Sequence, residues 1–225
     1  MSKLFLSGGG DIETSYPFDS LFFDSLSQSA NILYIPVAMA TTMTRTEASF
    51  DWFSKLISSH SSSDRHLDFT MWNAGDALPI LHNYDAVYVG GGNTYRLLMV
   101  LEKLGMLDAL KKYIRNGGIY YGGSAGAVIV GKSLRTVEEE NLENYSKHDG
   151  MNLINNISIF PHFSDSEEQK NTIRNICGNY ALTIAALPEN SGLILDERGI
   201  SVYGNMYLYE QEKETVFYTS GQIIK

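Results

Sequence analysis

The sequence predicts an α/β protein with a mostly parallel sheet flanked by helices. Short apolar segments recur along the first two-thirds of the chain, and stretches with helical periodicity separate them. Strands that are apolar on both faces are typical of a sheet that helices cover on both sides. The expected strands are 4–6, 32–35, 67–71, 86–89 and 119–121, and the expected helices include 48–57 and 95–104.

The last part of the chain has a different pattern. Residues 192–225 contain short apolar segments and glycine turns, which predict antiparallel strands added at a sheet edge. The serine-rich stretch 58–63 is expected to be a surface loop. No linker, repeat or long charge block divides the sequence, so we expect residues 1–225 to form one α/β domain.

Composition and charge exclude several classes of partner. The formal net charge of the 225 residues is -9, whereas nucleic-acid binding relies on a basic surface. The sequence has no apolar run long enough for a membrane span and no signal-peptide pattern. Its one cysteine, Cys177, is expected to be a buried residue of a helix. We therefore expect a cytoplasmic protein without nucleic-acid or membrane partners; assembly into a homo-oligomer stays open.

The strongest chemical signal is the segment Gly122-Gly123-Ser124-Ala125-Gly126, which follows the predicted strand 119–121. In a nucleophile elbow the turn from strand to helix is so tight that only small residues fit around the nucleophile. Such a turn would expose the Ser124 hydroxyl above the sheet and direct the Ala125 amide at an oxyanion. Close packing between a strand and a helix is the alternative explanation for these small residues.

A second glycine-rich turn, Gly90-Gly91-Gly92-Asn93-Thr94, follows the predicted strand 86–89 and opens a helix with free amides. Phosphate binding is one interpretation, but the spacings of nucleotide-binding loops are absent from the sequence. Acyl transfer needs two N–H groups directed at one charge, so we favour the amide of Gly91 or Gly92 as the second oxyanion donor beside that of Ala125. We expect Asn93 to contact the substrate. A glycine turn that only connects the strand to the helix is a third interpretation, which also stays open.

A serine nucleophile needs a base, and position favours His162 among the five histidines. His162 follows the predicted strand 157–161, whose end would bring the imidazole to the edge where parallel sheets bind ligands. The orienting acid is either Glu189, which follows the apolar stretch 182–187, or a member of an earlier acidic group. That group comprises Glu138, Glu139, Glu140 and Glu143. The order of residues differs from ordinary α/β-hydrolases, in which the histidine lies near the chain end.

Four segments occur in the order found in the aspartyl dipeptidase (peptidase E) family, whose relatives include cyanophycinase. They are residues 90–94, 123–127, 161–163 and 187–192, so the chain resembles that family over nearly its whole length. The resemblance implies a serine peptidase without cofactor or metal, on a class I glutamine-amidotransferase-like fold, that releases N-terminal aspartate from short peptides. It implies that Ser124 is the nucleophile, His162 the general base and Glu189 the orienting carboxylate. Glu139 would support the site and its substrate.

Specificity for aspartate requires a cation, which the resemblance places on the helix after His162. The family has closely spaced arginines there, whereas this sequence has Lys170 and Arg174, four residues apart and on one helix face. Arg174 is the first candidate, because a planar guanidinium binds a carboxylate through two hydrogen bonds. Surface pairing of either cation with Glu167 is the alternative.

Two other functions stay open. A cyanophycinase-like or broader-specificity peptidase would keep the triad and change only the pocket. A catalytically silent module would instead bind a ligand at the elbow without turning it over. A dipeptide panel separates the first from an aspartyl dipeptidase, and a serine-reactive phosphonate probe that fails to label Ser124 would favour the second.

Overall fold

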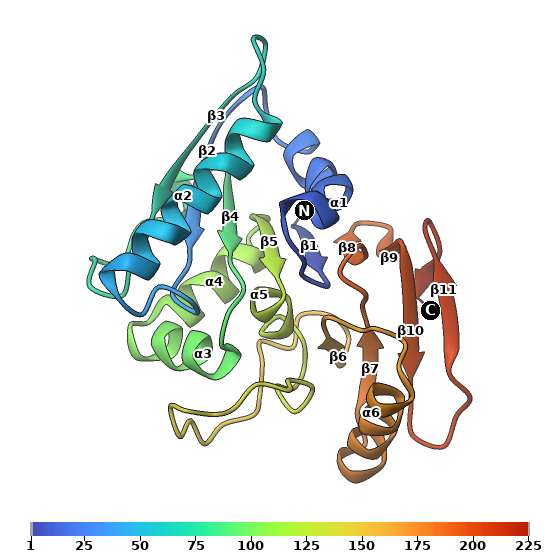
Figure 1. Ribbon diagram of the computed structural model, residues 1–225. Helices are drawn as coiled ribbons and strands as arrows, with labels where there is room; N and C mark the ends of the chain where they lie inside the picture. The colour runs from blue at the N-terminus through green and yellow to red at the C-terminus, as the bar shows by residue number, and fades with distance from the viewer. Residues whose placement is uncertain (1, 225) are drawn as a thin grey trace.

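The structure is a computed structural model that describes residues 2–224 and contains two β-sheets (Figure 1). The larger sheet has eight strands in the order β12-β9-β8-β1-β5-β4-β2-β3. They are β1 (Lys3–Ser7), β2 (Ser29–Ile35), β3 (His66–Met71), β4 (Ala86–Val89), β5 (Ile119–Gly123), β8 (Gly192–Asp196), β9 (Gly199–Tyr203) and β12 (Ile223–Ile224). Strands β1 to β5 pair in parallel, and β8, β9 and β12 continue the sheet antiparallel from β1. The predicted fold class is confirmed.

The smaller sheet has four strands in the order β11-β10-β7-β6. They are β6 (Ile157–Phe160), β7 (Thr183–Ala186), β10 (Asn205–Tyr209) and β11 (Val216–Thr219). Strands β6 and β7 are parallel, and the other pairs are antiparallel. The strand before His162 therefore belongs to a second sheet and not to the sheet that carries the elbow. Likewise, only part of the C-terminal segment extends the larger sheet, because β10 and β11 join the smaller one.

Helices cover both faces of the larger sheet (Figure 1). The helices are α1 (Ile12–Asp24), α2 (Met43–His60), α3 (Thr94–Lys103), α4 (Met106–Arg115), α5 (Ala125–Val128) and α6 (Glu167–Tyr180), with a 3-10 turn at Leu81–Asn83. On the face that α1 and α2 cover, Phe22 and Phe53 both contact the ring of Tyr88 edge to face. The sheet face and the two helices thus share one aromatic core.

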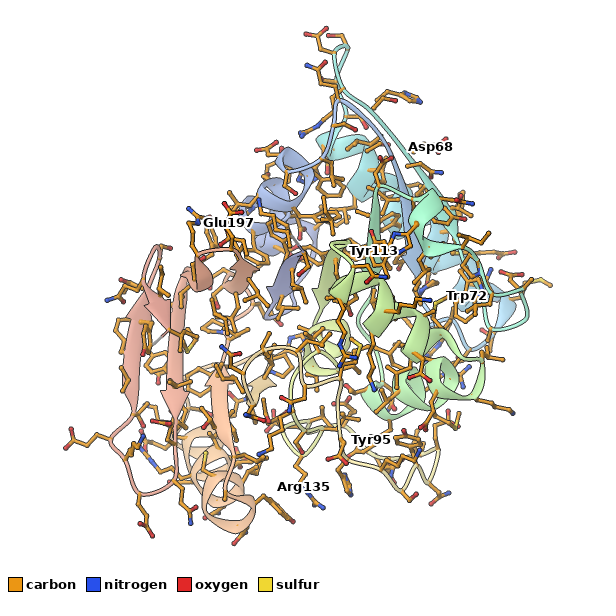
Figure 2. All side chains as sticks on the ribbon, turned by 180° about the vertical axis from the view of Figure 1, so that it is seen from behind. Asp68, Trp72, Tyr95, Tyr113, Arg135 and Glu197 are labelled. Carbon is orange, nitrogen blue, oxygen red and sulfur yellow. The ribbon has the colours of Figure 1, made fainter. Side chains whose placement is uncertain are left out.

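Helices α3, α4 and α5 cover the opposite face, where Leu97 and Val87 belong to one buried cluster. Figure 2, seen from behind, shows Trp72 and Tyr113, two large members of the same cluster. Apolar side chains on both faces of one strand are the reason that these short segments form a covered parallel sheet. Among residues 2–224, no helix is both long and apolar enough to cross a membrane.

Helix α6 covers the smaller sheet. Its Ile173 and Cys177 are buried with Phe160 and Ile184 of the sheet. Burial raises the pKa of the Cys177 thiol to about 11, so the side chain behaves as a small apolar residue. The expectation that 1–225 is a single domain stays a prediction.

Candidate active site

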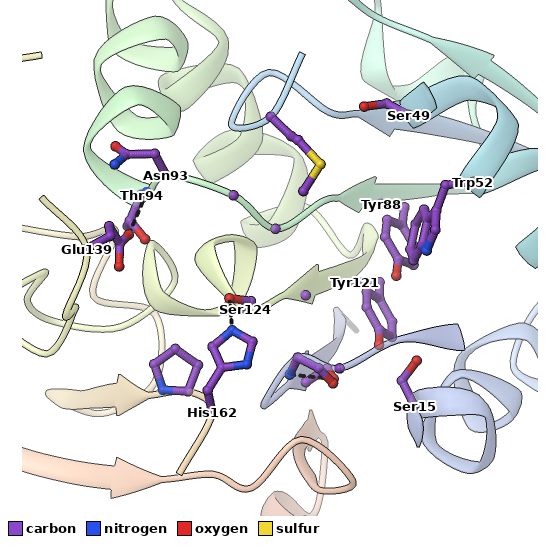
Figure 3. Close-up of a pocket in the computed structure, with 18 of the residues that line it drawn as sticks. Ser15, Ser49, Trp52, Tyr88, Asn93, Thr94, Tyr121, Ser124, Glu139 and His162 are labelled. Atoms are coloured by element: carbon purple, nitrogen blue, oxygen red, sulfur yellow. Dashed lines mark hydrogen bonds between the residues drawn. The ribbon is translucent and has the colours of Figure 1, made fainter. Parts of the chain in front are cut away.

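Ser124, His162 and Glu189 form a chain of hydrogen bonds between the two sheets. Ser124 follows β5, His162 follows β6 and Glu189 follows β7. The distance from Ser124 Oγ to His162 Nε2 is 2.7 Å (Figure 3). The distance from His162 Nδ1 to Glu189 Oε1 is 2.8 Å. When Nδ1–H donates to Glu189, the lone pair of Nε2 accepts from the Ser124 hydroxyl, as a general base requires.

The backbone at Ser124 has the strain of a nucleophile elbow. Its φ of 49° and ψ of -108° are unusual for a residue with a side chain. A Cβ at Gly122 would lie 2.4 Å from the carbonyl oxygen of Gly126, and one at Gly126 would lie 2.3 Å from that of Val89. The turn therefore excludes larger residues at both glycines and fixes the serine above the end of β5.

The predicted oxyanion donors lie at two turns, after β5 and after β4. Ala125 begins α5, where its amide has no preceding intrahelical acceptor. A Cβ at Gly91 would lie 3.3 Å from Ser124 Cβ and 3.8 Å from Ser124 Oγ, so the backbone of Gly91 lies directly beside the nucleophile. A Cβ at Gly92 would instead lie 2.7 Å from the carbonyl carbon of Ala38, and its φ is +127°. Gly91 is thus the better placed of the two glycines.

The loop Gly8–Gly10 after β1 supports the other two members of the chain, a role that the sequence did not reveal. The His162 amide donates to the Gly8 carbonyl oxygen at 2.9 Å. A Cβ at Gly9 would lie 2.3 Å from His162 Cε1, and one at Gly10 would lie 3.2 Å from Glu189 Cβ. Three consecutive glycines at a strand end were the available signal, but they do not say which side chains pack against them.

His162 differs from a buried structural histidine. Its side chain is 46% exposed and that of Glu189 is 48% exposed. His60, by contrast, is stacked between the rings of Tyr16 and Phe23, with centroids 4.5 Å and 4.3 Å away. Burial lowers the pKa of His60, which keeps it neutral within the core. His162 instead lines the same cavity as Ser124.

A cavity of about 600 Å³ opens at Ser124 (Figure 3). We name the side on which Asn93, Thr94 and Glu139 lie, together with Glu138, the neighbour of Glu139 in the chain, the acidic end. On the other side of Ser124 lies the aromatic arm, which is lined by Trp52, Tyr88 and Tyr121 together with Ser15 and Ser49. Tyr34, whose ring lies 6.3 Å from Trp52 and 5.9 Å from Tyr88, belongs to the same arm. The arm extends over the sheet face that α1 and α2 cover. Ser124 therefore lies between two chemically different surfaces.

Hydrogen bonds to the backbone and to α6 hold the acidic end. Asn93 Oδ1 caps α3 by accepting from the Arg96 amide at 2.9 Å, and Glu139 Oε1 accepts from the Thr94 amide at 2.7 Å. Glu138 Oε2 accepts from Gln169 Nε2 at 3.0 Å. The start of a helix favours a carboxylate, so Glu139 is held in place while it faces the cavity.

The structure does not bring Lys170 and Arg174 to Ser124. Lys170 Nζ lies 3.0 Å from Asp165 Oδ1 and 3.1 Å from Glu167 Oε1, and hydrogen bonds to these carboxylates raise its pKa. Arg174 donates to Asn171 Oδ1 at 3.3 Å and borders a different cavity. Neither side chain lines the cavity at Ser124.

An elbow serine hydrogen-bonded to a histidine, which in turn contacts a carboxylate beside a cavity, is the arrangement of a serine hydrolase. The family follows from the sequence match. Residues 4–203 match the model of peptidase family S51, so the chain belongs to that family and its membership supports a peptidase.

The related proteins are peptidases by name. The chain is 39% identical over 93 residues to Peptidase E of Streptomyces coelicolor (strain ATCC BAA-471 / A3(2) / M145), covering 41% of this chain and 38% of that protein. It is 28% identical over 151 residues to Peptidase E of Escherichia coli O1:K1 / APEC, covering 63% of this chain and 66% of that protein. The matches thus cover less than two thirds of these relatives.

Two solved structures share the fold over almost the whole chain. A provisionally named peptidase E protein from Listeria monocytogenes EGD-e has a TM-score of 0.60 at 21% identity, covering 97% of this chain and 98% of its own. A peptidase from an acI-B1 Actinobacterium has a TM-score of 0.69 at 16% identity, covering 99% and 96%. At these identities the likeness establishes the fold.

Proposed function

We propose that this protein is a serine peptidase that removes the N-terminal residue from short peptides through an acyl-enzyme. The observation that carries the proposal is the hydrogen-bonded chain from Ser124 through His162 to Glu189 at the mouth of the cavity. Membership of peptidase family S51 supports the reaction class. No cofactor or metal enters the proposed reaction.

In the proposed mechanism, His162 Nε2 accepts the Ser124 proton as Oγ attacks the peptide carbonyl carbon. Glu189 stabilises the resulting imidazolium, and the amides of Ala125 and Gly91 bind the oxyanion. His162 then donates its proton to the leaving amine, the C–N bond breaks and an ester to Ser124 remains. Water, deprotonated by His162, hydrolyses that ester and restores the serine.

The acidic end supplies the proposed preference for a free N-terminus. Glu138 and Glu139 face the cavity, and two carboxylates in a confined space favour a cationic group such as the α-ammonium of a peptide. An ammonium held there would place the first peptide bond at Ser124, which would limit cleavage to the N-terminal residue. The same geometry would disfavour an N-acetylated peptide.

Aspartate in the first position is the finer proposal, which follows from the resemblance to aspartyl dipeptidases. Lys170 or Arg174 would then have to leave its present contacts and reach the cavity. A broader-specificity peptidase is the second candidate, and the absence of lysine and arginine among the described residues that line the cavity favours it.

The test is kcat/KM for the wild-type protein and Ser124→Ala on dipeptides that begin with Asp, Glu, Asn, Ala or Lys, with N-acetylated versions of each. We expect cleavage of free-amine dipeptides, with acetylation lowering kcat/KM by about 100-fold or more. Loss of cleavage in the variant would support the serine mechanism. Absence of any Ser124-dependent cleavage would contradict the proposal and favour a silent binding module.

A further inference from the structure

We infer that the aromatic arm binds the side chain of the substrate's first residue, and that it takes a large uncharged side chain, aromatic or methionine-like, in preference to a carboxylate. The inference rests on the proposed function in its broader-specificity form, because it names the substrate class of the same site, and it replaces aspartate as the preferred first residue. It follows from where the arm begins, from what lines it and from the charges around it.

The arm begins directly beside the nucleophile. A Cβ at Gly123, the residue before Ser124, would lie 3.6 Å from Tyr121 Cε1 and 3.8 Å from the Tyr88 hydroxyl. Ser124 and both tyrosines line the same cavity. Figure 3 shows Ser124 between these tyrosines and Glu139. A residue whose carbonyl carbon lies at Ser124 Oγ would therefore extend its side chain into the arm while its ammonium faces the acidic end.

The walls of the arm are rigid and flat. Tyr88 and Tyr121 stack with ring centroids 4.3 Å apart at 7°, and Trp52 lies 6.3 Å from Tyr88. Tyr34, Tyr88 and Tyr121 are 4%, 3% and 1% exposed, so the aromatic core holds them in place. Aromatic walls bind other rings by stacking or edge contact and bind thioethers through sulfur contacts. A preformed apolar pocket of this kind suits an uncharged side chain.

The charges around the arm disfavour an anion. Among the described residues that line the whole cavity there is no lysine or arginine. Asp19 is buried behind the arm, where it accepts a hydrogen bond from Ser15 Oγ at 2.7 Å and another from the Tyr121 hydroxyl. Burial raises the pKa of Asp19 to about 6, so this carboxyl is largely ionised at neutral pH. A substrate carboxylate in the arm would lose water and meet like charge.

Three cations would contradict this inference if one of them bound a substrate carboxylate. Arg45 lies one helical turn before Ser49 on α2, on the same face, and is exposed without lining the cavity. Lys170 and Arg174 are hydrogen-bonded on α6. Any of the three would have to reorient toward the arm to bind a carboxylate. Each can be removed separately.

The first experiment measures kcat/KM for Phe-Ala, Met-Ala, Ala-Ala and Asp-Ala with the wild type, Trp52→Ala and Phe50→Ala. Phe50 is the matched control, an exposed aromatic residue of α2 that does not line the cavity. In the wild type, we expect kcat/KM for Phe-Ala and Met-Ala to exceed that for Asp-Ala by about 100-fold. Trp52→Ala should lower kcat/KM for Phe-Ala by about tenfold and change that for Ala-Ala by no more than about threefold. In Phe50→Ala, kcat/KM for every peptide should stay within about threefold of the wild-type value. Fastest cleavage of Asp-Ala, or an equal loss for all peptides in Trp52→Ala, would overturn the inference.

The second experiment adds or removes a cation. Ala48 is exposed and lines the cavity, so Ala48→Arg should raise the ratio of Asp-Ala to Phe-Ala cleavage by about tenfold. Ser58→Arg, at an exposed position of the same helix outside the cavity, adds the same charge as a control. An unchanged ratio in Ala48→Arg would count against the arm as the side-chain site. Selective loss of Asp-Ala cleavage in Arg45→Met, Lys170→Met or Arg174→Ala would show that one of these cations binds a carboxylate.

A covalent probe separates this inference from the proposed function. Diphenyl α-aminophosphonates of phenylalanine and aspartate react when a serine oxygen attacks phosphorus and phenoxide leaves, so they report side-chain preference without turnover. Faster modification of Ser124 by the phenylalanine analogue, together with no peptide hydrolysis, would support the arm and contradict only the peptidase. Equal or slower modification by the phenylalanine analogue, or no modification of Ser124 by either, would overturn the inference itself.

Discussion

The two sheets contribute to the active site in different ways. The larger sheet holds Ser124 through its backbone, because Gly122 and Gly126 leave no room for a Cβ. The smaller sheet provides His162 and Glu189, whose side chains are about half exposed and rest on the loop after β1. One tight turn thus positions the proposed nucleophile, whereas a contact between the two sheets positions the proposed base and acid. Disturbing that contact should impair catalysis more than folding.

The largest expected effect is that of Ser124→Ala. Removing the nucleophile of a triad costs about 10⁶ in kcat, because its members act together. The serine hydroxyl is at the cavity surface, so we expect the melting temperature to change little. Peptide hydrolysis at saturating substrate and thermal unfolding check both points. Retention of more than about 1% of the activity would contradict the role of Ser124.

Glu189→Gln should have the next largest effect. The amide can no longer stabilise the imidazolium through Nδ1, and the loss for such a replacement in a triad is about 10³- to 10⁴-fold in kcat. Glu143→Gln is a control among the other acids considered, because Glu143 pairs with Arg96 at 3.0 Å and does not line the cavity. An equal loss in both variants would mean that Glu189 is not the orienting acid.

Gly9→Ala tests the contact between the sheets. The added methyl group would lie 2.3 Å from His162 Cε1, so the imidazole must move away from Ser124. A displacement of about 1 Å typically costs about 100-fold in rate. Gly221→Ala is the matched control, because Gly221 also has a positive φ, +85°, and nothing lies within 4 Å of its Cβ position. If Gly9→Ala kept full activity, the loop after β1 would not position the base.

The smallest effect concerns stability and not catalysis. The pKa of Asp19 is raised by burial from 3.8 to about 6, so the folded protein holds a proton that the unfolded chain releases. Stability should therefore fall as the pH rises from about 4 to about 6, by about 3 kcal/mol. Asp19→Asn should remove this slope in urea unfolding at several pH values, whereas Asp51→Asn, at an exposed position, should keep it. Persistence of the slope in Asp19→Asn would contradict this account.

The sequence predicted much of the fold because the relevant signals are local. The five apolar parallel strands match their predicted positions closely, and the small residues around Ser124 predict a turn with no room for a Cβ. His162 and Glu189 each follow a short apolar strand, which is also visible without a structure. These features depend on steric limits and on periodicity within a few residues.

Other features depend on long-range packing and were not predictable. A four-residue apolar strand such as β6 can join either sheet, since periodicity does not encode its partner. Tyr88 and Tyr121 belong to apolar strands and resemble ordinary core residues in the sequence. They line a cavity only because α1 and α2 leave space over them. The helix spacing of Lys170 and Arg174 likewise predicts a shared face but not the direction of that face.

The most direct test of the central claim is mass spectrometry of the protein after reaction with a diphenyl α-aminophosphonate. The account predicts one adduct, mapped to Ser124, that forms rapidly in the wild type and is absent in Ser124→Ala. In His162→Ala the adduct should form at least about 10³-fold more slowly than in the wild type. No adduct in the wild type, or an adduct that forms equally fast without His162, would contradict a serine nucleophile activated across the two sheets.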